Sequence, residues 1–228
     1  MSKPEPARIV VIVSGRGSNL EALIAATEDG SIDGRVVAVI SNRPGAFALE
    51  RARRHGIAAL TVDHTAYADR ASFDRALREA VDAHAPTLVV LAGFMRILTP
   101  EFVAHYAGRM LNIHPSLLPA YTGLHTHAHA LADGVERHGA SVHFVTNELD
   151  GGPVVLQGEV AVRNGDDPER LAARVQRIEH VIYPQAVAWY AAGRLRLAGG
   201  HVELDGRRID VPPRLRLEDI DHGCTITD

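Results

Sequence analysis

The chain has 228 residues, and 46% of them are hydrophobic, which is enough for one sizeable core and compatible with a single domain. The formal net charge of -4 gives no indication of a nucleic-acid partner or of a membrane surface. The N-terminus lacks an apolar signal core, and residues 9–13 are too short to span a bilayer, so we expect a cytoplasmic protein. The lone Cys224 has no partner for an internal disulfide, which fits a reducing compartment.

Lys3 is the only lysine in the chain, and it lies in the N-terminal tail. A phosphate-loop NTPase needs a lysine in its loop, and a pyridoxal enzyme or a Schiff-base aldolase needs one in its active site. The composition therefore excludes these three kinds of chemistry.

The first half of the chain alternates short β-branched runs with helical patterns. Strands are predicted at residues 8–14, 36–41, 58–62 and 87–92, and helices at 18–28, 46–55 and 70–83. This alternation is typical of βαβ units and of a parallel sheet that is buried on both faces. A fifth strand is predicted to end at His114. Ligands of open parallel sheets bind beyond the carboxyl ends of the strands, where Ser14, Asn42, Asp63, Gly93 and His114 fall.

The second half is less regular. We expect a helix at residues 126–133, two strands at 139–145 and 153–162, a long helix at 167–191, and small closing strands within 194–211. No repeat, linker or low-complexity segment is visible. The sequence therefore predicts one domain over residues 1–228, with residues 1–7 flexible and residues 199–228 forming a peripheral tail.

Asn112, His114 and Asp150 are the candidate catalytic residues. Asn112 and His114 are two residues apart in an extended run, so both side chains would face the same cleft. Asp150 lies in a turn-forming run, Asn147 to Pro153. An amide and a protonated imidazole stabilise a developing oxyanion, and a carboxylate orients the ring and favours its charged form. The alternative is a buried Asn–His pair at a strand end, with Asp150 as an ordinary turn residue.

The glycine-rich run from Ser14 to Leu20 follows the first strand and opens the first helix. Its glycines let the backbone approach a ligand, and the amides of the helix N-terminus can hold an anion. A dinucleotide fingerprint would have a third glycine where this chain has Leu20, so a nicotinamide cofactor is disfavoured. Phosphate binding is favoured here, and the alternative is that Ser18 only caps the helix.

Three histidines, His125, His127 and His129, resemble a metal cluster. No carboxylate or cysteine is spaced to complete a four-ligand site, so we predict no metal and interpret these side chains as helix-capping or surface histidines.

Three further groups are ambiguous on local grounds. Residues 95–98 follow a strand end, and their apolar strip with one guanidinium either holds a flat heteroaromatic ligand or packs as an ordinary connection. Arg70 opens a helix, an unfavourable position for a cation unless it meets an anionic ligand or lies solvated at the surface. Gln176 and Glu179 share one helix face, which by default is a solvated face.

Taken together, these motifs resemble the phosphoribosylglycinamide formyltransferase family. The resemblance runs from about Arg8 to Arg196. It rests on SGRGSNL, LAGFMRIL, LNIHPSLLP, GLHTH, GASVHFVT, ELDGGPV and VQRIEHVIYP. It implies a Rossmann-like α/β fold with a mostly parallel central sheet flanked by helices, and formyl transfer from 10-formyltetrahydrofolate to the amine of glycinamide ribonucleotide in purine biosynthesis.

The resemblance also implies roles for individual residues. Asn112, His114 and Asp150 would be catalytic. The ribonucleotide would be bound by Gly17, Ser18, Asn19, Gln176 and Glu179. The folate would be bound by Arg70, Met95, Arg96, Ile97, Leu98, Asn112, Thr146, Asn147, Glu148, Leu149 and Asp150. No metal and no nicotinamide is implied, the partners are small molecules, and we expect a monomer or a weak homodimer.

Two departures and two rivals remain. The chain departs from relatives at residues 120–122 and in the tail 199–228, and we expect neither segment to touch the catalytic trio. Formyl-folate hydrolysis is the rival enzyme, but that activity goes with an extra N-terminal module, and only residues 1–7 precede Arg8 here. The non-enzymatic rival is a nucleotide- or phosphate-sensing module that uses the first loop alone.

Overall fold

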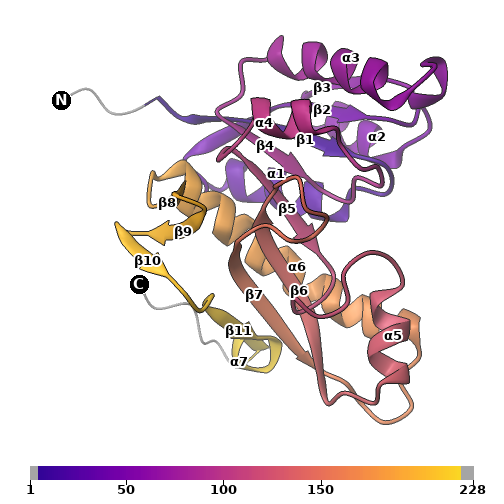
Figure 1. Ribbon diagram of the computed structural model, residues 1–228, viewed down its shortest axis with the longest axis vertical. Helices are drawn as coiled ribbons and strands as arrows, with labels where there is room; N and C mark the ends of the chain where they lie inside the picture. The colour runs from indigo at the N-terminus through magenta and orange to yellow at the C-terminus, as the bar shows by residue number, and fades with distance from the viewer. Residues whose placement is uncertain (1–4, 222–228) are drawn as a thin grey trace.

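Five parallel strands form the first part of the central sheet in the computed structural model, which describes residues 5–221 (Figure 1). They are β1 (Ala7–Val13), β2 (Gly34–Ser41), β3 (Ala58–Thr61), β4 (Leu88–Leu91) and β5 (Met110–His114). Residues 9–13 of β1 are fully buried, because helices cover both faces of the sheet. The predicted α/β class is confirmed, since the sheet is mostly parallel and is flanked by helices.

The helices divide between the two faces of the sheet. Alternate β1 residues such as Val11 and Val13 pack with α1 (Ser18–Glu28), α2 (Phe47–Arg54) and α6 (Pro168–Ala191). The intervening residues Val10 and Ile12 pack with α3 (Arg70–Asp82) and α4 (Pro100–His105). The sequence did not predict α4 or the short 3-10 turn at His64–Ala66.

The strand order places two connections on opposite sides of one crevice. The eight-stranded sheet has the order β11-β7-β6-β5-β4-β1-β2-β3, so the chain leaves β1 toward β2 and leaves β4 toward β5. The loops after β1 and β4 therefore diverge. A crevice between diverging loops at the carboxyl ends of strands is the usual ligand site of an open α/β sheet.

Two antiparallel strands extend the sheet beyond β5. They are β6 (Arg137–Phe144) and β7 (Val154–Ala161), and the loop between them carries Asp150. Helix α6 packs against both strands. Gly158 permits this close packing, because a Cβ at that position would lie 2.3 Å from Ile178 Cγ1.

The C-terminal segment is not peripheral throughout. It begins with an antiparallel sheet of β8 (Leu195–Ala198), β9 (His201–Leu204) and β10 (Arg207–Ile209). It then adds β11 (Arg214–Arg216) to the main sheet, parallel to β7, and ends in α7 (Leu217–Asp221). At the other end, Ala7 is already part of β1. Cys224 lies outside the described residues.

Glu159 of β7 anchors this segment. Its carboxylate is buried and lies 3.2 Å from Arg214 Nη1, 3.2 Å from Arg216 Nε and 3.7 Å from Arg137 Nε. Two of these arginines belong to β11. The backbone ladder joins β11 to β7, and the ion pairs of this buried carboxylate strengthen the connection.

We expect Glu159→Gln to lower the free energy of unfolding by about 1–2 kcal/mol, because the three arginine side chains lose their shared anion but are about half exposed and screened by solvent. Amide hydrogen exchange at Leu215 should accelerate with it. Urea denaturation and exchange measure the two effects. Glu50→Gln, which breaks an exposed pair with Arg54, is the matched control, and equal effects of the two substitutions would contradict the anchor.

Candidate active site

Ser14, directly after β1, connects three strand ends. Its hydroxyl donates to Asn42 Oδ1 after β2 at 2.6 Å and accepts from the backbone amide of Met95 at 2.9 Å. Its own amide donates to the Gly93 carbonyl after β4 at 3.2 Å. The loops that follow β1, β2 and β4 are thus held together at the crevice.

The glycine-rich loop turns into α1 at Gly17. Gly17 has a left-handed φ of 74° and is the N-cap, and a Cβ there would lie 2.6 Å from Ala48 Cβ, so only glycine fits. No side chain caps this helix end, and Ser18 is its first residue. The alternative that Ser18 only caps α1 is therefore wrong, and the first amides of α1 remain available to an anion.

The five residues assigned to the ribonucleotide line a single cavity of about 400 Å³. Two hydrogen bonds join its walls. Gln176 Nε2 donates to Ser18 Oγ at 2.9 Å, and Asn19 Nδ2 donates to Glu179 Oε2 at 2.9 Å. Asn19 Oδ1 is buried without a hydrogen-bond partner. Sequence reasoning missed other residues of this wall, namely Arg43 and His127.

Glu179 is a buried carboxyl group within this wall. Burial raises its pKa to about 7, and the hydrogen bond from Asn19 opposes that rise only in part. Gln176 and Glu179 were interpreted by default as a solvated face. Gln176 is exposed, but Glu179 is not, because α6 presses it against α1.

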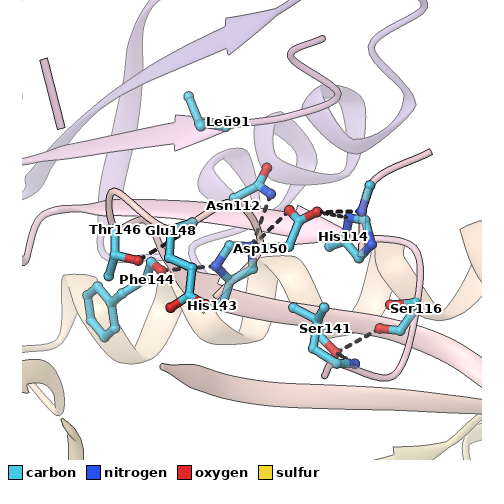
Figure 2. A network of polar contacts seen from close by, with 12 residues as sticks. Leu91, Asn112, His114, Ser116, Ser141, His143, Phe144, Thr146, Glu148 and Asp150 are labelled. Atoms are coloured by element: carbon cyan, nitrogen blue, oxygen red, sulfur yellow. Dashed lines mark hydrogen bonds and ion pairs between the residues drawn. The ribbon is translucent and has the colours of Figure 1, made fainter. Parts of the chain in front are cut away.

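The candidate catalytic residues meet at the carboxyl end of β5 (Figure 2). His114 is 5% exposed, and its Nδ1 lies 3.4 Å from Asp150 Oδ2. Its Nε2 lies 2.8 Å from the Tyr121 carbonyl. A carbonyl only accepts, so Nε2 carries a proton, and a second proton on Nδ1 gives an imidazolium that faces a carboxylate.

Asn112 points into the same network but contacts a residue that the sequence analysis missed (Figure 2). Its Nδ2 lies 3.1 Å from His143 Nε2, and His143 Nδ1 donates to the Phe144 carbonyl at 2.9 Å. Burial lowers the pKa of His143, so its Nε2 is an unprotonated acceptor and the Asn112 amide donates to it. His143 could have been noticed in the sequence as a histidine inside an otherwise apolar strand. Its partner Asn112 becomes visible only from the pairing of β5 with β6.

The loop after β5 touches the trio, contrary to our expectation for residues 120–122. The Tyr121 carbonyl accepts from His114, and the Gly123 amide donates to Asp150 Oδ2 at 2.9 Å. Both contacts are made by backbone groups of the loop, and such contacts leave no residue pattern in the sequence. The path of this loop therefore bears directly on how His114 and Asp150 are held.

Most of the residues assigned to the folate lie on two loops, whereas Arg70 belongs to α3 and Asn112 to β5. Met95, Ile97 and Leu149 are more than half exposed, which is unusual for large apolar side chains and indicates a surface for an apolar ligand. The guanidinium of Arg96 lies 5.3 Å from the Phe73 ring centroid. Arg70 is exposed at the first turn of α3 and does not line the cavity described above.

The histidine-rich segment starts α5 (Thr126–Ala132). His125 is its N-cap in a left-handed conformation, His129 is exposed, and His127 Nδ1 lies 3.1 Å from His138 Nε2. Within residues 5–221, no group of three or more histidine, cysteine or acidic side chains is placed to hold a metal ion. Over the same residues, no helix has the length and apolar character needed to cross a bilayer.

Comparison with known proteins identifies the family. Residues 7–187 match the formyl transferase family. The chain is 56% identical to phosphoribosylglycinamide formyltransferase of Escherichia coli strain K12, over 90% of this chain and 96% of that protein. The same enzyme of Coxiella burnetii, a solved structure, superimposes with a TM-score of 0.89 and 46% identity over 92% of this chain and all of that one.

A formyltetrahydrofolate deformylase structure from Pseudomonas putida is also similar. It has a TM-score of 0.79 and 30% identity over 90% of this chain and 72% of that one. The chain belongs to the phosphoribosylglycinamide formyltransferase family. The resemblance inferred from its motifs is confirmed.

The buried carboxyl of Glu179 leads to a prediction about pH. Because the pKa of Glu179 is raised in the folded protein, the folded state binds more protons than the unfolded state, and this residue's contribution to stability falls as pH rises from about 4.5 to about 7. Glu179→Gln should therefore gain stability relative to the parent across that range, by about 3 kcal/mol at most.

Urea denaturation of both proteins between pH 5 and pH 8 measures this difference. Glu148→Gln, at an exposed position, is the control and should leave the pH profile unchanged. A constant difference between Glu179→Gln and the parent at all pH values would rule out a neutral Glu179 in the folded state.

Proposed function

We propose that this formyltransferase transfers the formyl group of 10-formyltetrahydrofolate to the amine of glycinamide ribonucleotide, as its family membership indicates, and that Asn112, His114 and Asp150 carry the reaction. The observation that supports this most is the 3.4 Å approach of His114 Nδ1 to Asp150 Oδ2. This contact lies at the end of β5, beside a cavity suited to a phosphorylated ligand. An acyl transfer without a lysine or cysteine nucleophile needs such an arrangement of donors and charge.

The ribonucleotide phosphate would bind at the start of α1. The amides of Gly17, Ser18 and Asn19 and the positive end of the helix dipole suit an anion there. Glu179 and Gln176 on α6 would then meet the ribose hydroxyls, since both side chains line the same cavity. The free Oδ1 of Asn19 offers one more acceptor.

The folate would lie across the loops after β4 and β6. The exposed side chains of Met95, Ile97 and Leu149 provide the apolar surface for the pterin, together with the remaining residues of 95–98 and 146–150. Arg70, solvated at the start of α3, would meet the distal carboxylates of the folate. An exposed cation at a helix N-terminus is otherwise unfavourable, and an anionic ligand would explain why an arginine occupies this position.

The reaction needs two donors at the carbonyl oxygen. The substrate amine attacks the formyl carbon, and the resulting oxyanion accepts from an Asn112 N–H and faces the His114 imidazolium. One Asn112 N–H is committed to His143, which fixes the amide and leaves the other N–H for the oxyanion. The contact of His114 Nδ1 with Asp150 is longer than a strong hydrogen bond, so its proton has room for a second acceptor.

The bonds and protons of the transfer balance without an enzyme nucleophile. The C–N bond to the amine forms, the C–N bond to the folate nitrogen breaks, and the proton lost by the amine is transferred to that nitrogen. We assign the relay to a water beside Asp150, whose carboxylate keeps the imidazolium paired throughout. Bringing the two substrates together replaces a covalent step.

Hydrolysis of the formyl-folate is the second candidate, favoured by the likeness to the Pseudomonas putida deformylase. Water would replace the amine at the same trio. This reaction has no use for a phosphate cavity at α1, however, and the identity to phosphoribosylglycinamide formyltransferases is higher.

Incubation with 10-formyltetrahydrofolate, with and without glycinamide ribonucleotide, separates the candidates. Folate release that depends on the ribonucleotide supports transfer, and release without it supports hydrolysis. No release in either case would remove both enzymatic proposals.

His114→Ala should lower kcat on the order of a hundredfold or more, because the oxyanion loses the neighbouring positive charge. Steady-state kinetics of the formyl transfer measures this. His129→Ala, at an exposed position on α5, is the control and should keep parental rates. Near-parental turnover of His114→Ala would end the assignment.

A further inference from the structure

His127 belongs to the histidine-rich segment that neither metal binding nor the catalytic trio explains. It lies on the first turns of α5, and its ring lines the cavity that Gln176 and Glu179 also line. Its Nδ1 is 3.1 Å from His138 Nε2. Among residues 5–221, no hydrogen bond reaches the other ring nitrogen, Nε2, and this atom is not among the buried atoms without a partner. It is therefore exposed to solvent, on a residue that lines the cavity.

The hydrogen-bond chain behind His127 determines which ring nitrogen carries the proton. His138 is 1% exposed on β6, and the neighbouring Pro115 carbonyl favours a proton on its ring. A carbonyl only accepts, and His138 Nε2 faces His127, so we place the proton of the His138 ring on Nδ1. Burial lowers the pKa of His138 to about 4, so this ring is neutral and its Nε2 is a bare acceptor.

That acceptor fixes the state of His127. His127 Nδ1 has to donate to His138 Nε2, because two bare nitrogens 3.1 Å apart would repel each other. Burial and the neighbouring His114 also lower the pKa of His127 and disfavour a second proton on its ring. The relay from the Pro115 carbonyl through His138 thus leaves His127 Nε2 as an acceptor turned away from the relay.

We propose that His127 Nε2 is a specificity-determining acceptor for glycinamide ribonucleotide, which receives a hydrogen bond from an O–H or N–H group on the ribosyl-amide part of that ligand. The inference rests on the proposed function for the identity of the ligand. It extends the recognition surface from α1 and α6 to α5. It also gives buried His138 a positioning role, because His138 holds the His127 ring and sets its tautomer.

The chemistry of the cavity suits this role. Glu179, with a pKa near 7, is protonated in part at neutral pH and then has a proton to donate. Gln176 supplies both an amide donor and a carbonyl acceptor. The bare Nε2 of His127 can only accept, which distinguishes it from both, and it discriminates against a ligand that lacks the matching donor. A ligand that covers such a nitrogen without pairing it loses the nitrogen's hydrogen bond to water, and this cost gives hydrogen-bonding sites their discrimination.

Kinetics of three variants test the proposal. His127→Phe keeps a ring but removes the acceptor, and we expect the KM for the ribonucleotide to rise about five- to tenfold. The KM for the folate and kcat should change less than about twofold. His127→Gln places an amide oxygen near the lost Nε2 and should restore most of the affinity. His129→Gln, two residues along on the exposed face of α5, should resemble the parent.

The parental protein provides a second measurement that does not depend on any variant. Nitrogen-15 spectra of histidine-labelled protein should show His127 as a neutral ring with its proton on Nδ1. Addition of glycinamide ribonucleotide without folate should shift the Nε2 resonance upfield, as expected for a bare nitrogen that gains a hydrogen bond. The His129 resonances should not move.

The outcomes separate this inference from the proposed function. Formyl transfer with an unchanged KM in His127→Phe, or a His127 ring with its proton on Nε2, overturns the role of His127 and leaves the transferase intact. Absence of ribonucleotide-dependent folate release by the parent would instead overturn the proposed function. If His127→Phe fails to fold, the spectra of the parent decide.

Discussion

The pairing of β5 with β6 is the constraint on which the site depends. This antiparallel register sets Asn112 opposite His143 and His114 opposite Ser141. It also returns the chain through the β6–β7 connection, so that Asp150 lies over the end of β5 (Figure 2). A shift by one residue would turn Asn112 and His114 to the other face of the sheet. The catalytic geometry is therefore a property of strand register.

Burial controls which groups around the cleft are neutral. It lowers the pKa values of His127, His138 and His143 and raises that of Glu179, and in each case the charged form is the one disfavoured. A carboxylate faces one ring nitrogen of His114, and a carbonyl faces the other. We interpret the surrounding neutral rings as a set of fixed donors and acceptors around His114, which suits the stabilisation of a single developing anion.

Backbone groups do much of the positioning. The Tyr121 carbonyl and the Gly123 amide hold His114 and Asp150, the Phe144 carbonyl orients His143, and the first amides of α1 face the cavity. These contacts do not depend on side-chain identity. Substitutions at residues 120–122 are therefore compatible with an intact trio, provided that the path of the loop is kept.

The sequence by itself determined the alternation of strands and helices, the glycine-rich turn at Gly17, and the trio of Asn112, His114 and Asp150 as candidates. These features depend on local preference and on short spacing, which a linear pattern records. The structure decided that His143 supports Asn112, that the loop after β5 touches the trio, that β11 joins the sheet through Glu159, and that His127 meets His138. Each of these contacts joins groups that register, burial or a backbone path brings together. No local pattern encodes them, because the free energy that selects them arises from packing between distant segments.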